Sequence, residues 1–138
     1  CYSYFDEEMT WQQSEVICQL YDGHLTSVRT RKEHNYVFDL YKNNVYHAME
    51  EVVKPRPAVW IGFNDEEIEK TFVWNDDSVS KFTNWYTNEP NDVNGIENCG
   101  SIRRFESKQG DGKWNDIRCD CKHPFICKAP KYLSYIVE

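Results

Sequence analysis

Six cysteines in 138 residues are the strongest constraint on how this chain folds. Cysteine is this abundant in small proteins of oxidising compartments, where disulfides reinforce a limited hydrophobic core. The spacing does not favour zinc, because only one residue separates Cys119 from Cys121 and no pair of histidines completes a ligand set. Six cysteines can pair in many ways, and sequence alone does not choose among them. We therefore expect a disulfide-supported protein that is secreted or extracellular.

Length and charge exclude several classes of function. A chain of 138 residues is long enough for one domain with its own core. The formal net charge of -7 argues against nucleic acid as a partner, because phosphates attract a basic surface. No apolar run approaches the length of a transmembrane helix, so we expect no membrane insertion. No nucleophile is paired with one of the four scattered histidines, and we do not expect an enzyme.

Two capping boxes predict two helices in the first half of the chain. Thr10 and Gln13 begin the first helix, which Gly23 is expected to end, and Thr30 and Glu33 begin the second. Helical spacing predicts the inner faces of the two helices: Trp11, Ile17, Cys18 and Tyr21 in the first, Val37, Leu40 and Tyr41 in the second.

The second helix is expected to break at Asn43 and Asn44, with a further turn or two within residues 45–53 before Pro55. Residues 58–63 then form an apolar run that predicts a strand buried on both faces. Shorter strands are predicted at residues 1–5, 71–74, 102–105, 113–115 and 125–127. Because the helices come first and most strands follow, the fold class is α+β.

The stretch from Glu89 to Asp116 collects the side chains that hard cations prefer. Its oxygen donors form two clusters: Glu89, Asn91, Asp92 and Glu97 in the first, Asn115 and Asp116 in the second. Ca²⁺ takes about six to eight oxygen ligands from carboxylates, amide carbonyls and water. The sequence therefore predicts a Ca²⁺ site, and we expect it also to bind a molecule with adjacent hydroxyl groups.

Three motifs interleaved with four cysteines point to a family. WIGFND begins at Trp60, EPN at Glu89 and WND at Trp114, in order with Cys18, Cys99, Cys119 and Cys127. With these motifs the chain resembles a C-type lectin-like domain of the mannose type, for which EPN is the mark. The resemblance implies two helices flanking small antiparallel sheets, with a long calcium-binding loop region. We expect this domain to span residues 1–128 and a C-terminal tail to span 129–138.

The resemblance also implies a disulfide pattern, with bonds Cys18–Cys127 and Cys99–Cys119. Cys1 and Cys121 have no partners in the minimal family pattern. We expect them to pair with each other, and we keep two alternatives for Cys1. It could pair with a cysteine that this chain lacks, or with another chain, which would make a disulfide-linked homo- or hetero-oligomer.

In the family, matching residues hold the principal Ca²⁺ and hydrogen-bond the sugar: Glu89, Asn91, Glu97, Asn115 and Asp116. Val93 lies where a side chain could touch the sugar. Asp65, Glu69 and Asp92 match ligands of an auxiliary Ca²⁺, which Glu97 could bridge to the first. Asn98 stands where an Asp is usual, which removes one negative charge and weakens that second site.

The order of EPN implies sugars with equatorial 3- and 4-hydroxyls: mannose, glucose, N-acetylglucosamine, and fucose through equivalent groups. The QPD motif of galactose binders is absent. We expect extracellular glycan recognition, in innate immunity or adhesion. The alternative is a protein-interaction module of the same fold whose Ca²⁺ is mainly structural. The basic residues Arg103, Arg104, Lys108 and Lys113 either contact acidic or extended glycans or form a solvated turn.

Overall fold

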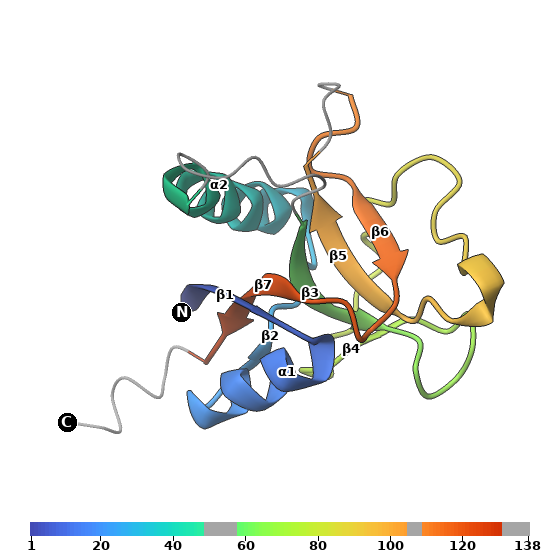
Figure 1. Ribbon diagram of the computed structural model, residues 1–138, viewed down its shortest axis with the longest axis horizontal. Helices are drawn as coiled ribbons and strands as arrows, with labels where there is room; N and C mark the ends of the chain where they lie inside the picture. Colours follow the sequence, from blue (N-terminus) through green and yellow to red (C-terminus); the bar gives the residue numbers. More distant parts are fainter. Residues whose placement is uncertain (49–57, 105–108, 131–138) are drawn as a thin grey trace.

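The computed structural model describes residues 1–48, 58–104 and 109–130. The elements in chain order are β1 (Tyr2–Met9), α1 (Trp11–Leu20), β2 (His24–Leu25), α2 (Arg31–Ala48), β3 (Ala58–Asn64), β4 (Val73–Trp74), the short 3-10 helix η1 (Val93–Gly95), β5 (Cys99–Arg103), β6 (Trp114–Ile117) and β7 (His123–Lys128). The α+β prediction is confirmed. The two helices lie on either side of β1 and β7, and a long loop region extends from the other end of the molecule (Figure 1).

The strands join into one sheet instead of separate small ones. Its order is β1-β7-β3-β5-β6, with β2 paired to β7 and β4 paired to β3. All these pairs are antiparallel except β3 with β7, which run parallel and meet at Trp60 and Phe125. This parallel contact connects the half of the sheet that holds the termini to the half that holds the loop region.

The strand β3 is buried along its whole length, as predicted. Successive side chains of a strand point to opposite faces, so β3 serves two hydrophobic clusters. Val59, Ile61 and Phe63 pack in the cluster that includes α2, and Trp60 packs in the cluster that includes α1. The central strand therefore ties both helices to the sheet.

Both predicted capping boxes lie at the N-termini of their helices. The box of α1 is complete, and the box of α2 forms only in part. At α1, Gln13 N donates to Thr10 Oγ1 at 3.2 Å and Thr10 N donates to Gln13 Oε1 at 3.1 Å. At α2, Glu33 N donates to Thr30 Oγ1 at 3.0 Å. The Glu33 carboxylate accepts from Arg29 N instead of Thr30 N, so only half of the second box forms.

The predicted break at Asn43 and Asn44 is wrong, because α2 continues to Ala48. Asn44 Nδ2 donates to Leu40 O at 2.8 Å, so its amide is satisfied within the helix and does not compete for the backbone elsewhere. Leu40, predicted to face inward, is half-buried. The rest of the turn predicted within 45–53 lies in residues 49–57, outside the described residues.

The end of α1 also differs from the prediction. Tyr21 is 63% exposed, because α1 ends at Leu20 and Tyr21 only caps it. The left-handed residue after the helix is Asp22, with φ 63°, and not Gly23. Gly23 is required for another reason: a Cβ there would lie 2.4 Å from Lys128 O of β7.

Two disulfides, Cys18–Cys127 and Cys99–Cys119, connect the structure. The expected Cys1–Cys121 bond is wrong. Cys1 lies beside Ala129 at one end of the β1–β7 pair, whereas Cys121 precedes the other end. Eight residues of strand separate these ends by about 25 Å. Disulfide-bonded Cα atoms lie within about 7 Å of each other, so the strand register prevents this bond.

None of the helices in the described part of the chain is long and apolar enough to cross a membrane.

Matched substitutions at Cys119 and Cys121 test the disulfide assignment. Cys119→Ser opens a loop of 20 residues and should lower the free energy of unfolding by about 3 kcal/mol. Cys121→Ser, two residues away and half-buried, should lower it by less than about 1 kcal/mol. Urea unfolding of both variants measures the difference, and equal losses would contradict the assignment.

Candidate metal centre

The carboxylate of Asp116 joins the sheet to the loop of residues 88–98. Asp116 lies in β6 and is fully buried. It accepts hydrogen bonds from Asn91 N at 3.1 Å and from Asp92 N at 2.7 Å. The peptide between Glu89 and Pro90 is cis. The two backbone hydrogen bonds to Asp116 hold the start of the loop against β6.

Glu89 and Asn115 face each other across this junction. One terminal atom of the Asn115 amide lies 2.9 and 3.0 Å from the two carboxylate oxygens of Glu89. With nitrogen in that place, Asn115 donates to Glu89. With oxygen there, three acceptor oxygens converge, and a cation or a proton on Glu89 would stabilise them. The geometry therefore suits both a site without an ion and one that holds Ca²⁺.

Negative charge accumulates around Glu89. Burial, together with the nearby carboxylates of Asp116 and Glu97, raises the pKa of Glu89 to about 7. Burial likewise raises the pKa of Glu97, with Asp116 and Asp92 adding to the effect. Carboxylates that repel each other in this way gain from binding either a proton or a cation.

Glu97 completes the principal set. Its Oε1 accepts from Val93 N at 3.1 Å, and its own N donates to Asp92 Oδ1 at 3.1 Å. All five residues predicted as principal ligands are thus brought together. Val93 is 48% exposed at the tip of the loop, where its side chain is accessible to a ligand.

The residues predicted for the auxiliary ion also lie together. Lys70 N donates to Asp65 Oδ2 at 2.9 Å and to Glu69 Oε2 at 3.1 Å. The nearby Asp65 carboxylate raises the pKa of Glu69, which Asp92 also contacts. Asp65 Oδ1 and Asn98 Oδ1 are buried, and no donor among the described residues reaches them. Buried oxygens without donors fit the ligand shell of a hard cation.

A third group of potential ligands is not a metal site. Glu66, Cys99 and Cys119 bring their ligand atoms within 4.8 Å of one another. The two sulfurs are bonded to each other, so neither offers the thiolate that binds a metal.

Two of the four basic side chains between Arg103 and Lys113 make internal contacts. Arg104 Nε donates to Asp111 Oδ1 at 2.9 Å, and Lys113 Nζ donates to Asn84 Oδ1 at 3.1 Å. These bonds favour a structural role for Arg104 and Lys113 over contact with a glycan. Lys108 lies outside the described residues.

Sequence reasoning missed the support beneath the site. His34 of α2 is buried, and its Nδ1 accepts from Trp114 Nε1 at 3.2 Å. Burial lowers the pKa of His34 to about 4, helped by the charges of Arg31 and Lys113, so His34 is neutral at physiological pH. Because 80 residues separate His34 from Trp114, no local pattern could have indicated this contact.

Comparisons with known proteins agree with the fold and identify the family. The family model of the lectin C-type domain matches residues 7–129. The alpha-N-acetylgalactosamine-specific lectin of Patiria pectinifera is 32% identical over 132 residues, which cover 93% of this chain and 73% of that protein.

Solved structures give the same picture. Human lithostathine superposes with a TM-score of 0.78 at 29% identity, covering 95% of this chain and 83% of that one. A calcium-independent type II antifreeze protein superposes with a TM-score of 0.72 at 26% identity, covering 94% of this chain and 85% of that one. C-type lectin domains are non-enzymatic carbohydrate-binding modules. The chain belongs to the C-type lectin domain family.

Proposed function

We propose that this protein binds glycans in a calcium-dependent manner, through sugars of the mannose type. The observation that carries the proposal is the convergence of oxygen donors around Glu89, where Asn115 faces both carboxylate oxygens and Asp116 and Glu97 lie nearby. Such a cluster repels itself when no cation is bound. Ca²⁺ is the ion that suits its all-oxygen chemistry.

Two ions are assigned to the site. The principal Ca²⁺ would be held by Glu89, Asn91, Glu97, Asn115 and Asp116. The auxiliary Ca²⁺ would be held by Asp65, Glu69 and Asp92, with the donor-free oxygen of Asn98 as an uncharged ligand. Because Asn98 contributes no charge, the auxiliary site should be the weaker of the two.

The side chains of the principal site would also select the sugar. Bound Ca²⁺ supplies open positions for two vicinal hydroxyl oxygens. The carboxylates of Glu89 and Glu97 can accept hydrogen bonds from those hydroxyls, and the amides of Asn91 and Asn115 can donate to them. This order of acceptors and donors fits equatorial 3- and 4-hydroxyls. Val93 can pack against the ring and adjust the choice among such sugars.

Membership of the family does not by itself determine which sugar is bound. The relative from Patiria pectinifera is named for alpha-N-acetylgalactosamine, so relatives at this level of identity need not share one sugar. In this chain the sequence from Glu89 to Asn91 is EPN, and this motif is our ground for mannose, glucose, N-acetylglucosamine or fucose.

The expected setting is extracellular, where disulfides persist, and glycan recognition there could serve innate immunity or adhesion. A single shallow site offers few contacts and binds weakly. Useful avidity would then need several copies, as a homo- or hetero-oligomer. The domain limits of 1–128, with a tail of 129–138, remain part of the proposal.

A protein-interaction module is the second candidate. It is favoured by the similarity to an antifreeze protein described as calcium-independent, because the fold can evidently work without the ion. In that case Ca²⁺ at this site would mainly hold the loop in place. Calcium-dependent binding of a sugar is expected of the lectin and not of the protein-interaction module, so this measurement distinguishes the two functions.

Chromatography on immobilised mannose tests the proposal directly. We expect retention in millimolar Ca²⁺, release by EDTA, and competition by free mannose but not by free galactose. A glycan array with and without calcium extends the same comparison. Flow-through in calcium, with the fold intact by circular dichroism, would favour the protein-interaction module.

Asp116→Asn tests the ligand set at nearly constant shape. The change removes a charge and turns an acceptor into a donor beside Asn91 N, so Ca²⁺ affinity should fall at least tenfold, or about 1.4 kcal/mol. Asp120→Asn is the matched control, because Asp120 is exposed and pairs with Arg118. Calorimetric titration with Ca²⁺ measures both, and equal affinities would contradict the assignment.

Acid should weaken calcium binding. Without the ion, folded Glu89 keeps its proton up to about pH 7, whereas the unfolded chain releases it near 4.5, so the apo-protein loses stability as pH rises between these values. Ca²⁺ must displace that proton, and its affinity should fall roughly fiftyfold from pH 7 to pH 5. The rise in melting temperature caused by Ca²⁺ should therefore shrink at pH 5. An equal rise at both pH values would contradict carboxylate ligation.

A further inference from the structure

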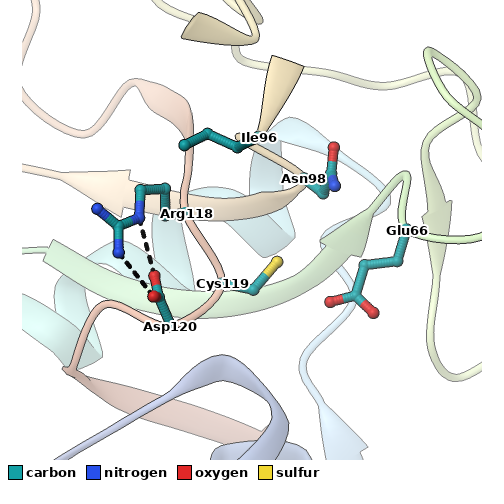
Figure 2. Close-up of a pocket in the computed structure, with 6 residues that line it drawn as sticks. All are labelled: Glu66, Ile96, Asn98, Arg118, Cys119 and Asp120. Atoms are coloured by element: carbon teal, nitrogen blue, oxygen red, sulfur yellow. Dashed lines mark hydrogen bonds and ion pairs between the residues drawn. The ribbon is translucent and has the colours of Figure 1, made fainter. Parts of the chain in front are cut away.

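A hollow of about 450 Å³ lies beside the proposed sugar site, and the proposed function does not use it. Six residues line it: Glu66, Ile96, Asn98, Arg118, Cys119 and Asp120. Figure 2 shows Ile96 and the Arg118–Asp120 pair toward one side and Asn98 and Glu66 toward the other, with the Cys119 sulfur between them.

The hollow shares two segments with the principal site. Ile96 and Asn98 flank Glu97 in the chain, so one wall of the hollow is continuous with the loop that carries this ligand. Arg118 follows Asp116 by two residues, which places their Cα atoms about 7 Å apart in extended backbone. Two segments of the chain therefore contribute residues both to the principal site and to the lining of the hollow.

The Arg118 side chain is held in place yet keeps donors available. Its Nε and Nη2 donate to the two carboxylate oxygens of Asp120, at 3.0 and 2.6 Å. A guanidinium has five N–H groups, so three remain for a ligand. The side chains of Arg118 and Asp120 are 56% and 65% exposed, so both can be reached from solvent.

The hollow also offers an apolar surface and hydrogen-bond acceptors. Ile96 is 50% exposed and offers an apolar surface at the edge of the hollow. The carboxylates of Glu66 and Asp120 can accept hydrogen bonds from hydroxyl groups. An apolar contact combined with donors and acceptors for hydroxyls suits a pyranose ring, which has an apolar face and a polar rim.

We propose that this hollow is a subsite for the second residue of an oligosaccharide whose first residue occupies the principal site, and that it prefers a neutral sugar. This inference rests on the proposed function. Two carboxylates oppose one guanidinium among the lining residues, so the net charge disfavours sialic and uronic acids. The hollow would thus make the protein select longer neutral glycans over single sugars.

Calorimetry with methyl mannoside and with a panel of neutral mannose-terminated di- and trisaccharides tests the subsite. In saturating Ca²⁺ the wild-type protein should bind the best oligosaccharide at least about fivefold more tightly than the monosaccharide, which is about 1 kcal/mol. Arg118→Ala should keep the monosaccharide and Ca²⁺ affinities and lose the fivefold preference. Arg29→Ala is the matched control, because Arg29 is 52% exposed and pairs with Glu33 on α2.

A second readout is independent of affinity. The Nε–Hε resonance of Arg118 should shift when the oligosaccharide binds and stay unchanged with the monosaccharide. Equal affinities for both ligands, a preference that survives Arg118→Ala, or tighter binding of sialylated glycans would each overturn the subsite while leaving the proposed function intact. Absence of binding to any sugar would overturn the subsite and the proposed function together.

Discussion

The two hydrogen bonds that Asp116 accepts from the backbone of Asn91 and Asp92 hold the functional region to the rest of the fold. Asp116 belongs to a strand that pairs with β5 through Gly100, so its position is set by the sheet. The loop beyond it has little regular structure of its own. An ionised carboxylate that is fully buried needs such donors, because hydrogen bonds to the charged form offset the loss of hydration. The same group therefore orders the loop and contributes charge to the site.

The packing of Trp114 holds β6, and with it Asp116, in a fixed position. Trp114 is fully buried, and its ring meets those of Phe63, Trp74, Phe82 and Trp85. Its indole N–H donates to a neutral histidine of α2, so even its polar atom is satisfied. The aromatic residues come from β3, β4 and the loop before the site. The hydrophobic cluster thus connects α2 to the strand that bears Asn115 and Asp116.

Structural features that depend on residues close together in the sequence could be predicted, whereas contacts between distant segments of the chain could not. The Thr10–Gln13 cap and the all-buried β3 depend on residues a few positions apart. The motifs EPN and WND carry four of the five predicted principal donors, and Glu97 was assigned from the family resemblance. By contrast, the contact of His34 with Trp114 joins residues that are 80 positions apart, and the failure of the Cys1–Cys121 pairing depends on strand register. The predicted break of α2 failed for a local reason, because the Asn44 amide bonds to Leu40 O within the helix. The hollow lined by Glu66 and Arg118 could not be predicted, since it exists only after the chain has folded.

The disulfide Cys99–Cys119 links the two proposed binding surfaces. Cys99 follows Glu97 and Asn98 directly, and Cys119 lies between the two members of the Arg118–Asp120 pair. A movement of either segment is therefore passed to the other through a covalent bond. The carboxylates around Glu89 repel one another when no cation is present, so an ion at that site would hold the loop end near Cys99 in one position. Through the disulfide, the same ion would also fix the position of Cys119, which lines the hollow. On this reasoning, calcium would prepare the subsite as well as the principal site, although no residue lining the hollow except Asn98 is proposed to touch an ion.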